Sequence, residues 1–247
     1  KLLEAAALRE QNPDLKIIAA GCLAQRYPQE IRAELPEVDG IVGTGSYGEI
    51  VRVLDKVLLG EQPICRGSIS APLVELPRFV STGPAWAYLR IAEGCDNRCA
   101  YCVIPSIRGK FRSRKKEDIL SEARSLAAAG CRELIIVAQD ITRYGSDLYG
   151  KPCLAALIEE LCKLDFSWIR LHYLYPELID DELIDVIARE PKVVKYLDIP
   201  IQHINDRILK RMNRRSTGAE IRALFRRLRE RIPGLVLRTS IITGLPG

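Results

Sequence analysis

The sequence predicts an α/β protein: a partial parallel (β/α) barrel preceded by the C-terminal half of a small α/β domain. Three observations predict this fold class. Apolar runs of strand length alternate with segments whose apolar residues recur at helical spacing. From residue 85 this alternation produces five strands, a pattern typical of a parallel sheet with right-handed crossovers. A stretch rich in proline and glycine at 60–84 separates this repeat from residues 1–59.

The composition is that of a globular protein. The chain has 247 residues, 47% of them hydrophobic, and a net charge of +5 from 37 basic and 32 acidic residues. This excludes long disorder, and the charge alone does not indicate a nucleic-acid partner. No apolar run reaches the roughly 18–20 residues of a membrane span. The sequence begins with Lys1 and its only methionine is Met212, so we expect a piece of a longer chain.

Residues 1–59 are predicted to contain strands at 16–20 and 38–42 and a helix at 47–59. Residues 43–48 spell G-x-G-x-x-G between the second strand and the helix. A dinucleotide site would need a further βαβ unit with an acidic residue about 20 positions on. The segment 60–84, a predicted linker or edge strand, follows instead, so we interpret the glycines as a turn that starts the helix.

Residues 85–247 are predicted to form the truncated barrel. We expect strands at 87–92, 133–138, 169–175, 196–201 and 235–243, and helices at 119–127, 154–164, 183–187 and 221–228. Gly130 is a suitable C-cap for the first of these helices. Polar residues follow several strands, among them Gln139 and Gln202. In parallel α/β folds that edge of the sheet is where ligands bind.

Three cysteines crowd into the loop that leaves the first barrel strand. Cys95, Cys99 and Cys102 form a C-x3-C-x2-C motif, and thiolates at this spacing suit zinc or an iron–sulfur cluster. A structural zinc ion requires four protein ligands, which would have to include Cys131 or Cys65. A 4Fe–4S cluster on three cysteines leaves one iron open to a small molecule. We therefore favour the cluster and keep zinc as the alternative.

The motif, with the aromatic Tyr101 before its last cysteine, resembles the radical S-adenosylmethionine (SAM) superfamily. The runs 92–105 and 108–114 resemble its methylthiotransferase branch. Within that branch, the runs at 138–145, 147–150, 168–171, 173–177 and 196–203 are similar to the RimO group, which modifies a ribosomal protein. The Gly-Gln-Asn-Val-like run of the tRNA-modifying MiaB group is not found at the second strand.

The resemblance implies a barrel of the radical SAM type, with a SAM-binding 4Fe–4S cluster on the three cysteines. It also implies further SAM contacts: Tyr101 near the adenine, Gln139 at the methionine moiety, Gln202 at the ribose, and the backbone of Gly244 at the adenine. For both glutamines, ordinary capping of a strand end is the alternative. Cys22, in the run 20–27, matches the third ligand of an auxiliary 4Fe–4S cluster. Its first two ligands would precede Lys1, and a TRAM domain would follow Gly247, so this piece would hold one of the two clusters.

The function implied by the resemblance is methylthiolation. One electron would cleave SAM to methionine and a 5′-deoxyadenosyl radical, which would take hydrogen from the β-carbon of an aspartate on small-ribosomal-subunit protein twelve. The implied partners are that protein or the ribosome, and a flavodoxin- or ferredoxin-like electron donor in the cytoplasm, with no membrane. One alternative is a tRNA adenosine methylthiotransferase. Another is a zinc-stabilised ribosome- or RNA-binding module without catalysis.

Several other features have plainer interpretations. His172 and His203, the only histidines, are expected to be hydrogen-bonded barrel residues. The basic run 108–116 follows the cysteine loop, and we weigh a substrate or SAM-carboxylate role against a solvated charged loop. A second basic cluster consists of Arg207, Lys210, Arg211, Arg214 and Arg215, for which the sequence suggests no specific role.

Overall fold

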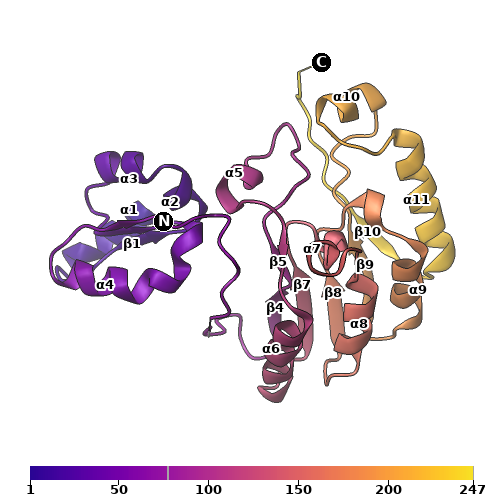
Figure 1. The fold of residues 1–247 in the computed structure, drawn as a ribbon, viewed down its shortest axis with the longest axis horizontal. Helices are drawn as coiled ribbons and strands as arrows, with labels where there is room; N and C mark the ends of the chain where they lie inside the picture. Colours follow the sequence, from indigo (N-terminus) through magenta and orange to yellow (C-terminus); the bar gives the residue numbers. More distant parts are fainter. Residues whose placement is uncertain (77, 247) are drawn as a thin grey trace. The chain divides into compact units, whose positions relative to one another are not determined.

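The computed structural model describes residues 1–76 and 78–246, and it divides into two compact units. Unit 1 contains Lys1–Leu76 together with Val103–Lys110. Unit 2 contains the remaining described residues (Figure 1). Among the described residues, no helix combines the length and the apolar character that crossing a bilayer requires.

Unit 1 is built on a three-stranded parallel sheet in the order β1-β2-β3. Its strands are β1 (Ile18–Ala20), β2 (Gly40–Val42) and β3 (Ile64–Cys65), and its helices are α1 (Leu2–Ala7), α2 (Cys22–Arg26), α3 (Pro28–Glu34), α4 (Ile50–Leu58) and α5 (Ile104–Arg108), with short 3-10 turns at Leu8–Glu10 and Thr44–Glu49. The first two strands and the last helix before residue 60 lie where the sequence predicts them. Strand β3 shows that part of the stretch 60–84 is an edge strand of this sheet.

The glycine-rich run at 43–48 is a tight turn packed against backbone. Residues Thr44–Glu49 form a 3-10 turn that leads into α4. A Cβ atom on Gly45 would meet the carbonyl oxygen of Gly67 at 2.6 Å, so only glycine fits there without a shift. Helix α5 belongs to the same unit: the Thr44 hydroxyl donates to the carbonyl of Ile107 at 2.7 Å.

Unit 2 contains a five-stranded sheet in the order β10-β9-β8-β7-β4, with every neighbouring pair parallel. Its strands are β4 (Trp86–Arg90), β7 (Glu133–Val137), β8 (Trp168–Leu171), β9 (Val193–Asp198) and β10 (Val236–Arg238); β5 (Ala92–Glu93) and β6 (Arg112–Ser113) form a separate antiparallel pair. The helices are α6 (Lys116–Ala128), α7 (Ser146–Tyr149), α8 (Leu154–Cys162), α9 (Asp181–Arg189), α10 (Asp206–Arg211) and α11 (Gly218–Arg231), with 3-10 turns at Ile141–Arg143 and Pro176–Leu178. The predicted strand–helix alternation is confirmed (Figure 1).

One face of this sheet forms the core with the crossover helices α6, α8, α9 and α11. Alternate strand residues such as Leu89, Ile136, Leu171 and Leu197 are fully buried, and they pack with apolar helix residues that include Ile119, Ile158, Ile184 and Leu228. Burying each such side chain stabilises the fold by about 1.5–3 kcal/mol. The apolar residues at helical spacing therefore form the stripe through which each helix packs against the sheet.

Local sequence signals set where these helices begin and end. Thr217 and Glu220 form a reciprocal capping box at the start of α11. Asp180 caps α9 and Asn205 caps α10 through their side-chain oxygens. Past the end of α6, Gly130 has φ +89°, the left-handed conformation expected of a C-terminal glycine.

The opposite face of the sheet, called the inner face below, carries charged and aromatic side chains. Strand alternation places Glu133, Arg170, Tyr196 and Arg238 on it, since the residues between them face the helices. Arg170 donates to Glu133 at 2.5 Å and stacks over the Tyr196 ring at 5.4 Å. Closed barrels fill this space with branched apolar residues. The inner face is therefore suited to polar contacts with a ligand.

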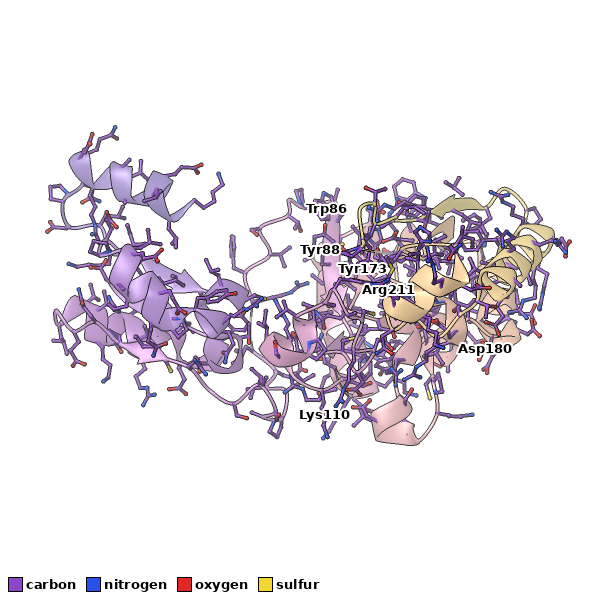
Figure 2. All side chains as sticks on the ribbon, turned by 90° about the horizontal axis from the view of Figure 1, so that it is seen from above. Trp86, Tyr88, Lys110, Tyr173, Asp180 and Arg211 are labelled. Atoms are coloured by element: carbon purple, nitrogen blue, oxygen red, sulfur yellow. The ribbon has the colours of Figure 1, made fainter. Side chains whose placement is uncertain are left out.

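Aromatic side chains continue the inner face at β4. Trp86 and Tyr88 meet edge to face with ring centroids 5.3 Å apart, and both are more than a third exposed (Figure 2).

Candidate cofactor and active site

The three cysteines lie on a loop without helix or strand between β5 and α5. Its conformation is fixed by bonds to distant parts of unit 2. The Ala100 amide donates to the carbonyl of Met212 at 3.0 Å, and the Asn213 side chain donates to the carbonyl of Arg98 at 2.8 Å. The turn after α10 thus holds the middle of the loop.

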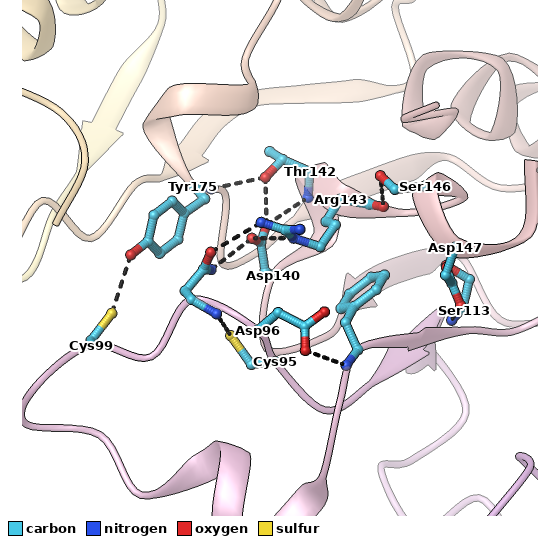
Figure 3. A network of polar contacts seen from close by, with 12 residues as sticks. Cys95, Asp96, Cys99, Ser113, Asp140, Thr142, Arg143, Ser146, Asp147 and Tyr175 are labelled. Atoms are coloured by element: carbon cyan, nitrogen blue, oxygen red, sulfur yellow. Dashed lines mark hydrogen bonds and ion pairs between the residues drawn. The ribbon is translucent and has the colours of Figure 1, made fainter. Parts of the chain in front are cut away.

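Asp140 anchors the start of the loop from the end of β7. Its fully buried carboxylate accepts a bond from the Asn97 side chain at 3.0 Å, and bonds from the backbone amide and the hydroxyl of Thr142 (Figure 3). Burial raises the pKa of Asp140, while these hydrogen bonds act in the opposite direction. The carboxylate connects the loop to the edge of the sheet.

Cys99 lies beside two polar side chains from later segments of unit 2, one after β8 and one after α10. The Tyr175 hydroxyl is 3.2 Å from the Cys99 sulfur, and an Arg214 guanidinium nitrogen is 3.9 Å from it (Figure 3 shows the Tyr175 contact). The guanidinium of Arg214 also stacks on the Tyr175 ring, 3.9 Å from its centre. Tyr101 also lies near Cys99. Burial, and then the bond with Cys99, raise the pKa of the Tyr101 hydroxyl. A hydroxyl and a guanidinium are therefore the polar groups next to the Cys99 sulfur.

Arg214 is a site residue that the sequence analysis missed. The sequence shows it only as one member of a basic cluster, whereas the structure leaves just 8% of it exposed and bonds it to the Pro200 carbonyl at 2.9 Å. The apolar residues Ile208, Leu209 and Met212, all buried, were the available signal, because their helical spacing turns this segment inward.

Cys95 lies in an unfavourable environment for a thiolate. Burial raises the pKa of its thiol, and the Asp140 carboxylate and the other two cysteines raise it further. A bond from the Asn97 amide, at 3.5 Å, opposes this. A free Cys95 therefore stays protonated to a higher pH than an ordinary cysteine.

The donor set fits an iron–sulfur cluster, although the thiols do not converge as they stand. Among the described residues, no three His, Cys, Asp or Glu side chains come together closely enough to hold a metal ion. Each of the three thiols is half-buried on one irregular loop, and thiolates are the ligands that such clusters require. Gln139 Oε1 is buried without a hydrogen-bond partner among the described residues, as expected for a residue that awaits a polar ligand.

The other predicted SAM contacts, Gln202 and Gly244, lie in the segments that follow β9 and β10. Gln202 has φ +70°, and its backbone bonds to Ser240 and Ile242 at 2.9 and 2.8 Å, in parallel register with Ile241. Gly244 has φ +78° with open space around its Cα. No described contact tests a role for these residues, so their assignments stay predictions.

Cys131, one of the two fourth ligands considered for the zinc alternative, is poorly placed. Cys131 is buried before β7, where its thiol donates to the carbonyl of Glu133 at the strand's first residue. The cysteine loop instead bonds to Asp140, beyond the other end of β7. Cys65 lies in β3 of unit 1.

Cys22, the predicted auxiliary ligand, begins α2 in unit 1. Its sulfur accepts a bond from Arg108 Nε at 3.3 Å. Part of the basic run 108–116 thus faces a predicted cluster ligand within the same unit.

This fold and cysteine loop define a class of protein. The family model of the radical SAM superfamily matches residues 89–247, and the chain belongs to that superfamily. Membership implies a 4Fe–4S cluster and SAM as cofactors.

The chain is similar along its length to ribosomal protein uS12 methylthiotransferases named RimO. It is 55% identical to that of Pelotomaculum thermopropionicum and 56% identical to that of Geobacter sulfurreducens, in both cases over 94% of this chain and 52% of the relative. It is 51% identical to the Acetivibrio thermocellus protein over 100% of this chain and 56% of that one. The chain thus spans about half the length of these relatives, and the predicted resemblance to the RimO group is confirmed.

Solved structures share the fold at low sequence identity. The radical SAM methyltransferase TsrM from Kitasatospora setae, with tryptophan and a SAM analogue bound, gives a TM-score of 0.71 at 16% identity over 100% of this chain and 54% of that one. The cobalamin-dependent radical SAM enzyme OxsB gives 0.69 at 15% identity over 99% and 39%.

Proposed function

We propose that this chain carries the SAM-cleaving part of a methylthiotransferase that modifies the β-carbon of an aspartate on ribosomal protein uS12. The observation that carries the proposal is the Cys99 environment, in which a tyrosine hydroxyl and a buried arginine from distant segments meet one thiol of the C-x3-C-x2-C loop. The names of the relatives at 51–56% identity support this substrate over a tRNA adenosine.

Cys95, Cys99 and Cys102 would hold the SAM-binding cluster, and Cys22 would contribute to an auxiliary one. When bound, such a cluster supplies the electron that cleaves SAM. The protein's part is to fix the loop through Asp140, to place the Tyr175 hydroxyl beside the sulfur of Cys99, and to exclude water. A flavodoxin- or ferredoxin-like donor in the cytoplasm would provide the electron.

Arg214 would bind the carboxylate of SAM. Its guanidinium faces the loop next to Cys99, is held by the Pro200 carbonyl and by the Tyr175 ring, and is largely shielded from water. A planar guanidinium in such a place is suited to bidentate recognition of a carboxylate. Gln139 would meet the methionine moiety of SAM through its unpaired oxygen, with Gln202 at the ribose and Gly244 and Tyr101 near the adenine.

The test compares two modified products in cells that lack the gene. Mass spectrometry of uS12 should show the loss of its methylthio group, while the methylthioadenosine of tRNA persists. The wild-type gene should restore the uS12 modification, and a Cys99→Ala gene should not. Loss of the tRNA modification instead, or an unchanged uS12, would overturn the proposal.

A further inference from the structure

Three buried polar atoms without a partner in the described part of the chain belong to residues at the ends of the strands of unit 2. Among the described residues, Gln139 Oε1, His172 Nε2 and Asp198 Oδ2 are buried and make no hydrogen bond. They come from the ends of three neighbouring strands, β7, β8 and β9. An unpaired buried polar atom costs free energy unless a ligand satisfies it.

Strand alternation places His172 and Asp198 on the same face. Leu171 and Leu197 are opposite each other in the β8–β9 register and are both fully buried against the helices. The residues that follow them therefore point to the inner face. The His172 and Tyr196 rings lie there 6.2 Å apart.

Of these two residues, Asp198 has the greater need for a hydrogen-bond donor, because its unpaired atom belongs to a buried carboxylate. Its side chain is 1% exposed, and one of its oxygens accepts a bond from Arg238 at 2.7 Å while the other has no partner. Arg238 lies opposite Asp198 in the β9–β10 register, and its side chain is 51% exposed. A buried carboxylate thus binds one guanidinium nitrogen of an arginine whose side chain is half exposed.

Two other inner-face arginines also pair with a carboxylate, and both are less exposed than Arg238. Arg170 bonds to Glu133 and stacks on Tyr196, with 29% of its side chain exposed. Arg90 bonds to Glu93 at 2.6 Å, with 42% exposed. Arg238 is the most exposed of the three and sits level with the orphaned oxygen of Asp198.

We infer that the Asp198–Arg238 pair is the receptor for the target aspartate of the polypeptide substrate. The Arg238 guanidinium takes the aspartate carboxylate, and Asp198 fixes the guanidinium and offers its second oxygen to an N–H group of the peptide. Since the β-carbon is bonded directly to that carboxylate carbon, holding the carboxylate also fixes the atom that reacts. This inference rests on the proposed function and deepens it.

The experiment measures binding of two uS12 peptides to the cluster-loaded chain in the presence of SAM. One peptide contains the target aspartate and the other has asparagine in its place. The wild-type chain should bind the aspartate peptide roughly tenfold more tightly or better, because a charge-assisted bond is lost with asparagine. Arg238→Gln should remove this preference, and Arg238→Lys, which keeps the ion pair with Asp198, should reduce it. Arg170→Gln is the matched control on the same face and should keep it.

Each other outcome has a definite meaning. If Arg238→Gln and Arg238→Lys both keep the full preference, or if Arg170→Gln removes it, the receptor assignment is wrong while the proposed function stands. If the Arg238 variants lose SAM affinity, the pair belongs to the SAM site and the inference is overturned. If the wild-type chain binds neither peptide, the proposed substrate fails together with the inference.

Discussion

Replacing Tyr175 with phenylalanine isolates one hydroxyl beside the candidate cluster. The substitution removes the oxygen that lies 3.2 Å from the Cys99 sulfur and keeps the ring on which Arg214 stacks. A hydrogen bond to a charged acceptor contributes about 1.5–3 kcal/mol. Only the part of this hydrogen-bond free energy that differs between the oxidised and the reduced cluster, on the order of 1 kcal/mol, changes the reduction potential. With about 59 mV per tenfold change for one electron, this corresponds to roughly 40 mV.

The sign follows from charge. The hydroxyl donates to sulfur and stabilises the more negative, reduced cluster, so its loss should lower the midpoint potential. Redox titration followed by electron paramagnetic resonance measures the shift. Tyr173→Phe is the control, because Tyr173 is on the same segment, 47% exposed, and has a described ring contact with His172 rather than with a cysteine. A Tyr175→Phe potential equal to that of the control would refute the reasoning.

Three further variants test the same site. Cys99→Ala should abolish SAM cleavage and leave the unfolding midpoint near that of the wild type, since the loop is peripheral to the core; persistent cleavage would contradict the ligand assignment. Arg214→Lys keeps the charge but loses the planar stack on Tyr175, and should weaken SAM binding about tenfold in equilibrium titrations; an unchanged affinity would contradict its role. Burial, then the Asp140 carboxylate, raises the pKa of Cys95, so Asp140→Asn should lower that pKa, increase the thiolate fraction at pH 8 and speed alkylation of Cys95 in cluster-free protein; a slower rate would contradict the electrostatics.

Periodicity was sufficient to predict the main elements of unit 2. The apolar stripe around Ile158 and the buried run around Ile136 are local signals, and each became the helix or strand expected. Short elements such as α7 and α10 were missed. Each has only four to six residues, too few for a periodic signal to emerge from the sequence.

The cysteine loop was predictable because its ligands are neighbours in sequence. The residues that surround it were not predictable. Tyr175 and Arg214 lie 76 and 115 residues beyond Cys99, and only the parallel sheet brings them to its edge. The same holds for Asp198 and Arg238, which are 40 residues apart and meet through the β9–β10 register. Composition indicated a basic protein, but it could not distinguish a buried arginine from a solvated one.

The most direct test of the central claim is anaerobic reconstitution of the chain with iron and sulfide, followed by electron paramagnetic resonance of the reduced protein with and without SAM. We expect a brown protein with about four irons in the cluster of the three-cysteine loop, and a spectrum that changes when SAM is added because one iron is open to it. A colourless protein that holds one zinc ion, or an iron signal that SAM leaves unchanged, would contradict it.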